Sequence, residues 1–373
     1  MKVVFLARWY PHKYDPMFGL FVQRHAEAAA LFNDITAIYV HPDEHARQTY
    51  EVERSTVNRV DTICVYYKKT GKLSSAWRYF TACRKALKLA GKPDVIHVHV
   101  LTRMGVVAWM HHLLHGTPYM ITEHWSRYLP GNDFDGAVRK WLTRRVVKDA
   151  AMVTTVTSCL GEAMRSHGLK HPDYRILPNV VDVRLFQPIP HHNETPKIVH
   201  ISCFEDKSKN ITGLLQALKI LKDRGISYQA VLIGEGLDYE AMKSLAHHLE
   251  LDDQVRFTGL LQGQKLVNEL ATGDFFVLSS NYETAGVVLV EALACGLPLV
   301  ATRVGGVPEI VDEHNGILVA PNDTLALAEA METLCKSHGN YPPEKLRESV
   351  TERYCYESVG RLLADWYQEI VNR

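Results

Sequence analysis

Short apolar runs alternate along this 373-residue chain with longer segments whose apolar residues recur at helical spacing. The first run covers residues 3–6, and a helical pattern follows from Val22 to Leu31. Short buried strands separated by helices are typical of a parallel α/β sheet. Further strand-like runs occur at residues 35–40, 95–98, 119–122, 152–156, 197–201, 229–234, 255–257, 275–278, 299–301 and 316–319.

The alternation is interrupted once near the middle of the chain and then starts again. Prolines and polar residues break both the helical and the strand periodicity there. They are Pro178, Pro188, Pro190, Pro196 and the polar run 191–194. We therefore expect two doubly wound domains with a boundary near residues 180–195. The last segment, from Tyr354 to Arg373, has apolar residues close to a 3.6-residue period and predicts an amphipathic helix.

Composition agrees with a folded protein of two domains at about 150 residues each. Hydrophobic residues make up 46% of the chain and charged residues 23%, which excludes a disordered or collagen-like protein. The seven cysteines are scattered and form no C-x-x-C pair, so neither a disulfide framework nor a zinc site is indicated. The expected compartment is the reducing cytoplasm. Because no apolar run reaches 18 residues, any membrane contact is expected to be peripheral.

The formal net charge of zero conceals a polarised chain. Residues 1–187 contain 26 basic and 16 acidic residues, for a net charge of +10, and residues 188–373 carry −10. A zero total argues against a nucleic-acid partner. The basic half either reflects drift between two domains or faces something anionic.

An anionic membrane is one candidate for that partner. The loop before the first helix, residues 16–21, is apolar, and residues 127–145 mix bases with aromatic side chains. Such segments suit a membrane surface or an acceptor carried on a lipid diphosphate. A core location of Trp141 and Leu142, with solvated bases around them, explains the pattern equally well.

Four glycine-containing turns follow predicted strands, where α/β proteins place their ligands. A missing Cβ lets a phosphate approach backbone N–H groups, although plain turn geometry also selects glycine. The turns contain Gly19, Gly234 with Gly236, Gly286, and Gly305 with Gly306.

The segment from Ser279 to Pro298 carries the clearest chemistry. A predicted strand ends near Leu278, a loop follows with Glu283, and a helix from about Gly286 to Cys295 would direct its free N–H groups over that loop. A diphosphate fits this position. Glu291 lies in an otherwise apolar helix and needs a partner, for which ligand hydroxyls are suited.

These residues resemble a known family. The chain is similar here to the retaining glycosyltransferases of family 4. The similarity rests on the spacing Glu283-x7-Glu291, on the Ala-x-x-x-Gly-x-Pro pattern that follows, and on the Gly305-Gly306 turn with Glu309. The first domain matches through Gly19 and through Thr122-Glu123-His124. Other matching segments are Leu177–Asp182 with Phe186, Lys209-Asn210, Gly234–Gly236, Val255–Gly259 and Asn315–Val319.

The resemblance implies a GT-B fold, in which two Rossmann-like domains face an interdomain cleft. It implies an acceptor-binding domain over residues 1–185 and a nucleotide-sugar-binding domain over residues 190–353. A C-terminal helix, residues 354–373, should pack back on the first domain.

The resemblance also implies roles for individual residues. Lys209 should neutralise the leaving diphosphate, Glu283 should grip the donor sugar, and His124 should face that sugar. The backbone around residues 285–287 should hold the phosphates, and Glu291 the ribose hydroxyls. The implied donor-binding residues are Gly19, Lys207, Gly234, Phe257, Ala285, Gly286, Val287 and Glu291.

Two positions depart from the family pattern. Where the family has an arginine in a Gly-Arg-Leu turn, this chain has Ser202-Cys203-Phe204, and Lys207 is the candidate substitute. An ammonium can serve a phosphate without the bidentate fork of a guanidinium. Thr284-Ala285 stands where Gly-Phe is usual.

The function implied is retaining, metal-independent transfer of a hexose-type sugar from a nucleoside-diphosphate sugar to a glycan or lipid-linked acceptor, without a further cofactor. Two alternatives stay open: a nucleotide-sugar epimerase of the same fold and a non-catalytic protein that binds sugar nucleotides. A Rossmann dehydrogenase is disfavoured, because no G-x-G-x-x-G follows the first strand.

Several metal-like patterns are interpreted as structural. Asp133-Phe134-Asp135 spells the Asp-x-Asp of metal-dependent transferases, but it follows a Gly-Asn turn rather than an apolar strand. His97 with His99 lies on a buried-looking strand, and the 111–115 histidines lie on a helix without a nearby carboxylate or cysteine. His25 is expected either to touch an anionic acceptor or to be solvated.

Overall fold

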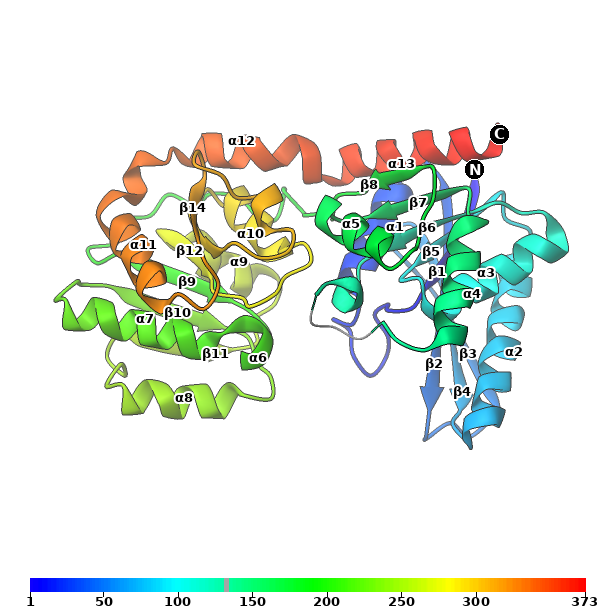
Figure 1. Cartoon of the computed structure of the whole chain (residues 1–373), viewed down its shortest axis with the longest axis horizontal. Helices are drawn as coiled ribbons and strands as arrows, with labels where there is room; N and C mark the ends of the chain where they lie inside the picture. The colour runs from blue at the N-terminus through cyan, green and yellow to red at the C-terminus, as the bar shows by residue number, and fades with distance from the viewer. Residues whose placement is uncertain (131–133) are drawn as a thin grey trace. The chain divides into compact units, whose positions relative to one another are not determined.

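The computed structural model describes residues 1–130 and 134–373, so Asp133 of the Asp-x-Asp pattern lies outside the described residues. The chain divides into two compact units. Unit 1 comprises Met1–Val180 together with Tyr356–Arg373, and unit 2 comprises Val181–Cys355. Both are α/β structures built on largely parallel sheets, as the sequence predicts (Figure 1).

Unit 1 contains an eight-stranded sheet in the order β3-β4-β2-β1-β5-β6-β7-β8. All neighbouring strands are parallel except β3 and β4. The strands are β1 (Lys2–Ala7), β2 (Asp34–Asp43), β3 (Tyr50–Val57), β4 (Val60–Lys68), β5 (Val95–His99), β6 (Tyr119–Glu123), β7 (Met152–Thr155) and β8 (Tyr174–Ile176). The helices are α1 (Leu20–Ala29), α2 (Lys72–Ala90), α3 (Thr102–His115), the 3-10 helix η1 (Ser126–Tyr128), α4 (Ala137–Lys148), α5 (Ser158–Ser166) and α13 (Tyr356–Val371).

The β3–β4 hairpin and helix α2 were not anticipated from the sequence. Strand β3 is largely exposed and pairs antiparallel with β4, so it lacks the apolar run that marks the buried strands. Its two-residue turn places Asn58 and Arg59 at positive φ, which matches the twist of a tight hairpin.

The predicted C-terminal helix forms as α13 and belongs to unit 1. Val359, Leu363 and Tyr367 are buried in the same core cluster as residues of α1. A Cβ on Gly360 would lie 2.2 Å from the carbonyl oxygen of Ala28, so glycine permits the close approach of the two helices. Arg175, on β8, adds a bidentate ion pair to Glu369 at 2.7 Å.

Unit 2 contains a six-stranded parallel sheet in the order β11-β10-β9-β12-β13-β14. The strands are β9 (Lys197–Ile201), β10 (Gln229–Ile233), β11 (Val255–Gly259), β12 (Phe275–Leu278), β13 (Leu299–Thr302) and β14 (Gly316–Val319). The helices are α6 (Asp206–Lys209), α7 (Ile211–Asp223), α8 (Tyr239–His248), α9 (Gly263–Ala271), α10 (Val287–Ala294), η2 (Val307–Glu309), α11 (Thr324–Ser337), η3 (His338–Asn340) and α12 (Pro343–Tyr354).

Alternate residues of the unit 2 strands face two apolar cores, one on each side of the sheet. Val199 and Phe276 belong to the core shared with α10 and α12, whereas Ile198 and Phe275 belong to the core shared with α7 and α11. Helices therefore cover both faces, which is why these strands are apolar along their whole length.

Each sheet has one point at which the strand order reverses. In unit 1 the chain continues outward from β1 in one direction and from β5 in the other; in unit 2 the reversal lies between β9 and β12. Ligands of open α/β sheets bind outside the carboxyl ends of the strands at such switch points. Within the described residues, no helix is long and apolar enough to cross a membrane.

Candidate active site

Lys209 and Glu283 meet at the switch point of unit 2. Lys209 ends α6, which follows β9, and Glu283 lies in the loop that follows β12. The Lys209 Nζ atom donates a hydrogen bond to Glu283 Oε2 at 2.7 Å, and the two side chains are only 17% and 16% exposed. The sequence motif and the topology therefore lead to the same position.

Three hydrogen bonds hold α6 against the loop that carries Glu283. The backbone N–H of Asn281 donates to the Ser208 carbonyl at 2.8 Å, and its side-chain amide donates to the Lys207 carbonyl at 3.1 Å. The Ser279 hydroxyl donates to the Lys209 carbonyl at 2.8 Å. These bonds fix the distance between the lysine and the glutamate through their backbones.

Lys209 keeps its positive charge in this pair. Burial disfavours the ammonium of Lys209, but the neighbouring Glu283 carboxylate outweighs this penalty and raises the pKa of Lys209 above its usual value. A cation is therefore available at neutral pH for an anionic ligand placed over the loop.

The N-terminus of α10 lies directly after Glu283. Gly286 precedes the helix with φ at 54°, and no side chain caps the first turn. The Leu289 N–H donates to the Gly286 carbonyl at 2.9 Å, and the helix dipole favours an anion near the N–H groups that precede it. Ala285, Gly286 and Val287 thus occupy the position that the sequence assigned to phosphate binding.

The glycine turns bring backbones into close contact. A Cβ on Gly305 would lie 1.7 Å from the Glu283 carbonyl oxygen, and the Gly306 N–H donates to that same oxygen at 3.3 Å. Gly234, with φ at 133°, has the Ser202 carbonyl oxygen 1.9 Å from its would-be Cβ. Both glycines are required by the packing of the turns themselves.

The remaining predicted residues of unit 2 lie at different depths. Glu291 is buried on α10, with 6% exposure, whereas Lys207 is exposed on α6. Phe257 lies on the edge strand β11 and packs its ring 6.0 Å from Phe204 and 5.9 Å from Tyr239. The structure thus places Phe257 in an aromatic cluster.

In unit 1, His124 lies just after β6 and is almost fully buried. Its Nε2 lies 3.0 Å from His99 Nδ1, and its ring centroid lies 4.8 Å from that of Phe21. Gly19, with φ at 70°, precedes α1, and a Cβ there would fall 2.4 Å from the Trp9 carbonyl carbon. Glycine therefore lets this turn pass against the backbone that follows β1.

His25 is fully buried, so the expectation of a solvated or acceptor-facing side chain is wrong. Its two ring nitrogens lie 2.9 Å from the carbonyl oxygens of Phe21 and Pro178. Burial lowers the pKa of His25 to about 4 and lowers the pKa values of His99 and His124 well below the usual range. All three imidazoles are neutral at neutral pH.

These three histidines form the one group among the described residues whose side chains could hold a metal ion. One ring nitrogen from each of His25, His99 and His124 lies within 4.8 Å of the others. The sequence pattern instead paired His99 with His97. His97 is structural, as expected: its nitrogens lie 2.7 Å from the Tyr367 hydroxyl and 2.6 Å from the Thr122 hydroxyl.

Glu123 organises the backbone around the carboxyl ends of β5 and β6, a role that the sequence analysis missed. Its Oε1 accepts hydrogen bonds from the N–H groups of His124 and Trp125, and its Oε2 accepts one from Leu101. Burial raises the pKa of this carboxyl group. The available signal was an acidic residue at the end of a strand that is otherwise apolar.

Comparison with known proteins adds to this geometry. Residues 183–353 match the family model for glycosyl transferases group 1, and residues 22–180 match the glycosyl transferase 4-like domain. The chain is 30% identical to the N-acetyl-alpha-D-glucosaminyl L-malate synthase of Bacillus anthracis over 74% of this chain and 75% of that protein. It is 27% identical to the alpha-D-kanosaminyltransferase of Streptomyces kanamyceticus over 68% of this chain and 71% of that protein.

Solved structures share the fold over the whole chain. The sucrose-phosphate synthase of Thermosynechococcus elongatus superposes with a TM-score of 0.82 at 20% identity and covers 100% of both chains. The HepE protein of Anabaena, solved in complex with UDP, superposes with a TM-score of 0.77 at 18% identity, covering 99% of this chain and 100% of that one. With the two family models matched in succession, this chain belongs to the group 1 glycosyltransferases and has their GT-B fold.

Proposed function

We propose that this glycosyltransferase moves a hexose-type sugar from a nucleoside-diphosphate sugar to a glycan or lipid-linked acceptor, with retention of configuration and without a metal ion. The observation that carries the proposal is the Lys209–Glu283 pair beside the uncapped N-terminus of α10. It offers a cation, a carboxylate and free N–H groups at a switch point, which together suit a sugar diphosphate.

The proposed reaction develops negative charge on the departing diphosphate as the glycosidic carbon becomes oxocarbenium-like. Lys209 and the amides of α10 stabilise that charge, which is the task a metal ion performs in other transferases. The bond from the sugar carbon to the phosphate oxygen breaks, and the bond to the acceptor oxygen forms on the same face. The acceptor proton passes to the leaving phosphate oxygen.

Thermal-shift measurements with UDP, GDP, ADP and their sugars test the donor part of the proposal. A ligand that binds only the folded chain raises its melting temperature. We expect one nucleoside diphosphate to give a shift that is abolished in Lys209→Ala and kept in Lys243→Ala, an exposed lysine of α8. Absence of a shift with every nucleotide would contradict the proposal.

Product analysis separates the proposed function from its two rivals. An epimerase releases a rearranged free sugar without an acceptor, and a non-catalytic binding protein shows no turnover with any acceptor. We expect a glycoside that forms only when an acceptor is present, at a rate unchanged by excess chelator.

We also propose that unit 1 contacts an anionic membrane through the groove between α2 and α3. Leu73 and Trp77 on α2 are 90% and 76% exposed, and Leu114 on α3 is 74% exposed. The groove has a volume of about 990 Å³, and Arg84 and Lys88 lie along it. Apolar side chains bordered by bases suit a lipid surface with anionic headgroups.

This surface differs from the segments that the sequence suggested. Of residues 127–145, Trp141 is exposed rather than buried in the core, whereas Arg127 and Arg139 line a separate pocket.

Co-sedimentation with vesicles of phosphatidylcholine, with and without phosphatidylglycerol, tests the proposed membrane contact at two salt concentrations. We expect binding that requires the anionic lipid, falls with salt, and is lost in Trp77→Ser; binding indifferent to anionic lipid and salt would contradict it.

A further inference from the structure

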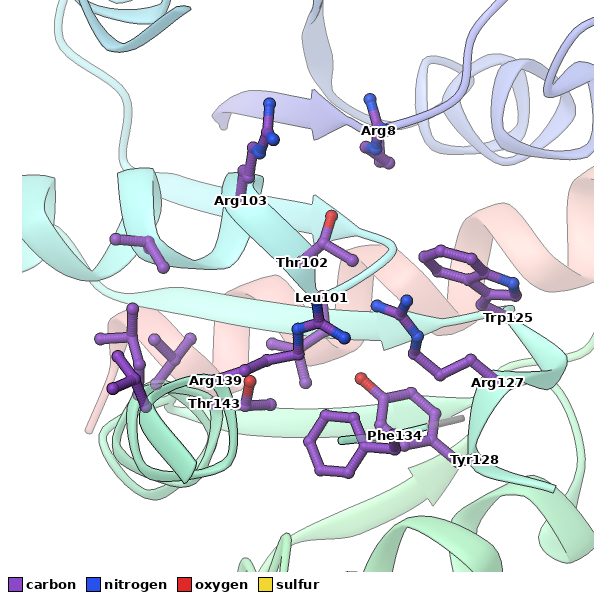
Figure 2. Close-up of a pocket in the computed structure, with 14 residues that line it drawn as sticks. Arg8, Leu101, Thr102, Arg103, Trp125, Arg127, Tyr128, Phe134, Arg139 and Thr143 are labelled. Atoms are coloured by element: carbon purple, nitrogen blue, oxygen red, sulfur yellow. The ribbon is translucent and has the colours of Figure 1, made fainter. Parts of the chain in front are cut away.

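A pocket in unit 1 gathers four arginines at the carboxyl ends of the strands. It has a volume of about 410 Å³ and is lined by Arg8, Arg103, Arg127 and Arg139, together with Trp125. Figure 2 shows Arg127 and Arg139 extending from different segments toward the same part of the pocket, near Leu101 and Thr102.

The four arginines come from four separate segments that meet at the switch point of the unit 1 sheet. Arg8 directly follows β1, and Arg103 lies in the first turn of α3, directly after β5. Arg127 lies in η1 after β6, and Arg139 lies on α4. The fold thus collects them where an open α/β sheet binds its ligands.

Two buried polar atoms in this pocket have no hydrogen-bond partner in the part of the chain that the structure describes: Arg127 Nε and Thr102 Oγ1. Leaving a buried donor unpaired is costly, so such atoms indicate a missing ligand or water. The guanidinium of Arg127 lies 3.9 Å from the centre of the Trp125 ring, which holds it in place. An acceptor oxygen in the pocket would satisfy both atoms.

Among the described residues, the positive charge of the pocket is balanced only in part, by the attraction between Arg127 and the buried Glu123 carboxylate. None of the four arginines forms an ion pair with any residue that the structure describes. Glu123 is the carboxylate nearest in sequence to Arg127, but both of its oxygens accept backbone N–H groups. The pocket therefore holds four arginines that form no ion pair with the described residues, beside the N-terminus of α3, which no described side chain caps.

The backbone beside the pocket is strained. Val100, between β5 and α3, has φ at 66°, a left-handed conformation that a β-branched residue rarely adopts. The Glu123 carboxylate holds the next N–H, that of Leu101. Strained residues that are held by their surroundings cluster at ligand sites.

We propose that this pocket binds an oxyanion, a phosphate or a carboxylate group, carried by the acceptor substrate. The proposal rests on the proposed function, because it assigns the acceptor to unit 1. Guanidinium forks match the paired oxygens of both groups, and the charge-assisted hydrogen bonds would select an anionic acceptor over a neutral one.

Anion binding is tested first in the full-length Lys209→Ala protein, whose donor site lacks its cation. Inorganic phosphate and succinate are titrated and followed by calorimetry. We expect saturable binding of at least one of them, weakened at least about tenfold by Arg127→Gln or Arg103→Gln. Arg47→Gln, an exposed arginine outside the pocket, should bind as the parent does. Absence of saturable binding, or equal binding in every variant, would overturn the proposal.

Two further variants separate a loss of anion binding from a loss of folding. Arg139 is exposed, so Arg139→Gln cannot disturb the core and should still weaken binding. Arg127→Lys keeps the charge without the fork and should bind with intermediate affinity. If Arg139→Gln and Arg127→Lys both bind as the parent does, the pocket is not the anion site.

The nucleotide thermal shift separates failure of this proposal from failure of the proposed function. Every arginine variant should keep the shift, because Lys209, Glu283 and the first turn of α10, which are proposed to hold the diphosphate, lie in unit 2. In transfer assays these variants should raise the KM for an anionic acceptor and leave that for its neutral ester unchanged. Equal changes in the KM values for the charged acceptor and for its ester would overturn the proposal. If no nucleotide raises the melting temperature of the unmodified protein, only the donor assignment is overturned.

Discussion

Lys209 is subject to two opposing effects at the residue scale. Burial disfavours its charge, and the Glu283 carboxylate 2.7 Å away favours it more strongly. The lysine is therefore an ammonium that is already desolvated before a ligand arrives. Such a group stabilises developing negative charge with little reorganisation, which is the requirement for a leaving diphosphate.

Replacing Lys209 by alanine removes this cation and leaves Glu283 without its partner. We expect kcat to fall at least about a hundredfold, since single preorganised electrostatic groups contribute on that order. Steady-state kinetics of Lys209→Ala and of Lys243→Ala provide the comparison. A Lys209→Ala protein that is folded and turns over at a near-normal rate would refute the assigned role.

His200, on β9, makes the stability of unit 2 depend on pH. Its ring nitrogens lie 2.9 Å from the Val277 carbonyl and 2.8 Å from the Ser202 hydroxyl, and burial lowers its pKa to about 4. The unfolded chain binds a proton near pH 6.5, so this contribution is complete above that pH and is lost as the pH falls toward 4.

We expect the free energy of unfolding to drop by about 3 kcal/mol over this interval through His200 alone. Urea melts at pH 7 and pH 4.5 measure the change. His200→Gln should show a smaller difference between the two pH values, and an equal difference would exclude His200 as the source.

At the scale of elements, the loop with Glu283 depends on the turn after β13. Gly305 has φ at 48°, and a Cβ there would overlap the Glu283 carbonyl oxygen. Gly305→Ala should therefore displace the loop and lower kcat/KM, although Gly305 itself makes no contact with the proposed chemistry.

Gly225→Ala is the matched control for this change. Gly225 also has positive φ, at 74°, but nothing lies within 4 Å of its would-be Cβ. Both variants should lose about 1 kcal/mol of stability from backbone strain. Gly305→Ala should lose more through the overlap, and only Gly305→Ala should lose activity. Equal activities in the two variants would show that the loop position does not matter.

The contact between α1 and α13 should be equally sensitive to one added methyl group. Gly360→Ala places a Cβ against the Ala28 carbonyl, so we expect a loss of about 1–3 kcal/mol and a lower melting temperature. Gly339→Ala, where nothing lies within 4 Å, should leave the melting temperature nearly unchanged. A melting temperature for Gly360→Ala equal to that of Gly339→Ala would contradict the packing described.

At the element scale, most strands with a buried apolar run could be predicted from the sequence, although β4, which is also buried and apolar, was missed together with its hairpin partner β3. Strand β12 and helix α10 follow from apolar runs bounded by Glu283 and glycine turns. Strand β3 was missed because solvent covers it, and so its residues carry no apolar signal. Hydrophobic periodicity reports burial, not backbone pairing.

The same limit applies to the sites. Lys209 and Glu283 were each expected at the donor site because family-like spacing marks both residues, but their ion pair was not predicted. The grouping of His25, His99 and His124 and the arginine pocket each require three or more segments to meet, and the role of Glu123 requires the segments after β5 and β6 to meet. Apart from the position of the acidic Glu123 at the end of an apolar strand, nothing local to those residues distinguishes them from structural or solvated side chains.

For the whole molecule, the charge asymmetry of the sequence coincides with the division into two compact units. Unit 1 contains 27 basic and 18 acidic residues, for a net charge of +9, and unit 2 carries −9. Unit 2, which is acidic, holds the cation Lys209 in a buried ion pair with Glu283. Unit 1, which is basic, contains both the arginine pocket and the groove between α2 and α3. The proposed sites for anionic ligands therefore lie separately in each unit.

The most direct test of the central claim is the configuration of the product. Proton NMR of a reaction between the nucleoside-diphosphate sugar that stabilises the protein and an acceptor, in excess chelator, reports the anomeric coupling of the new glycoside. We expect a glycoside with the configuration of the donor. An inverted glycoside, a reaction that stops in chelator, or free sugar as the sole product would contradict the account.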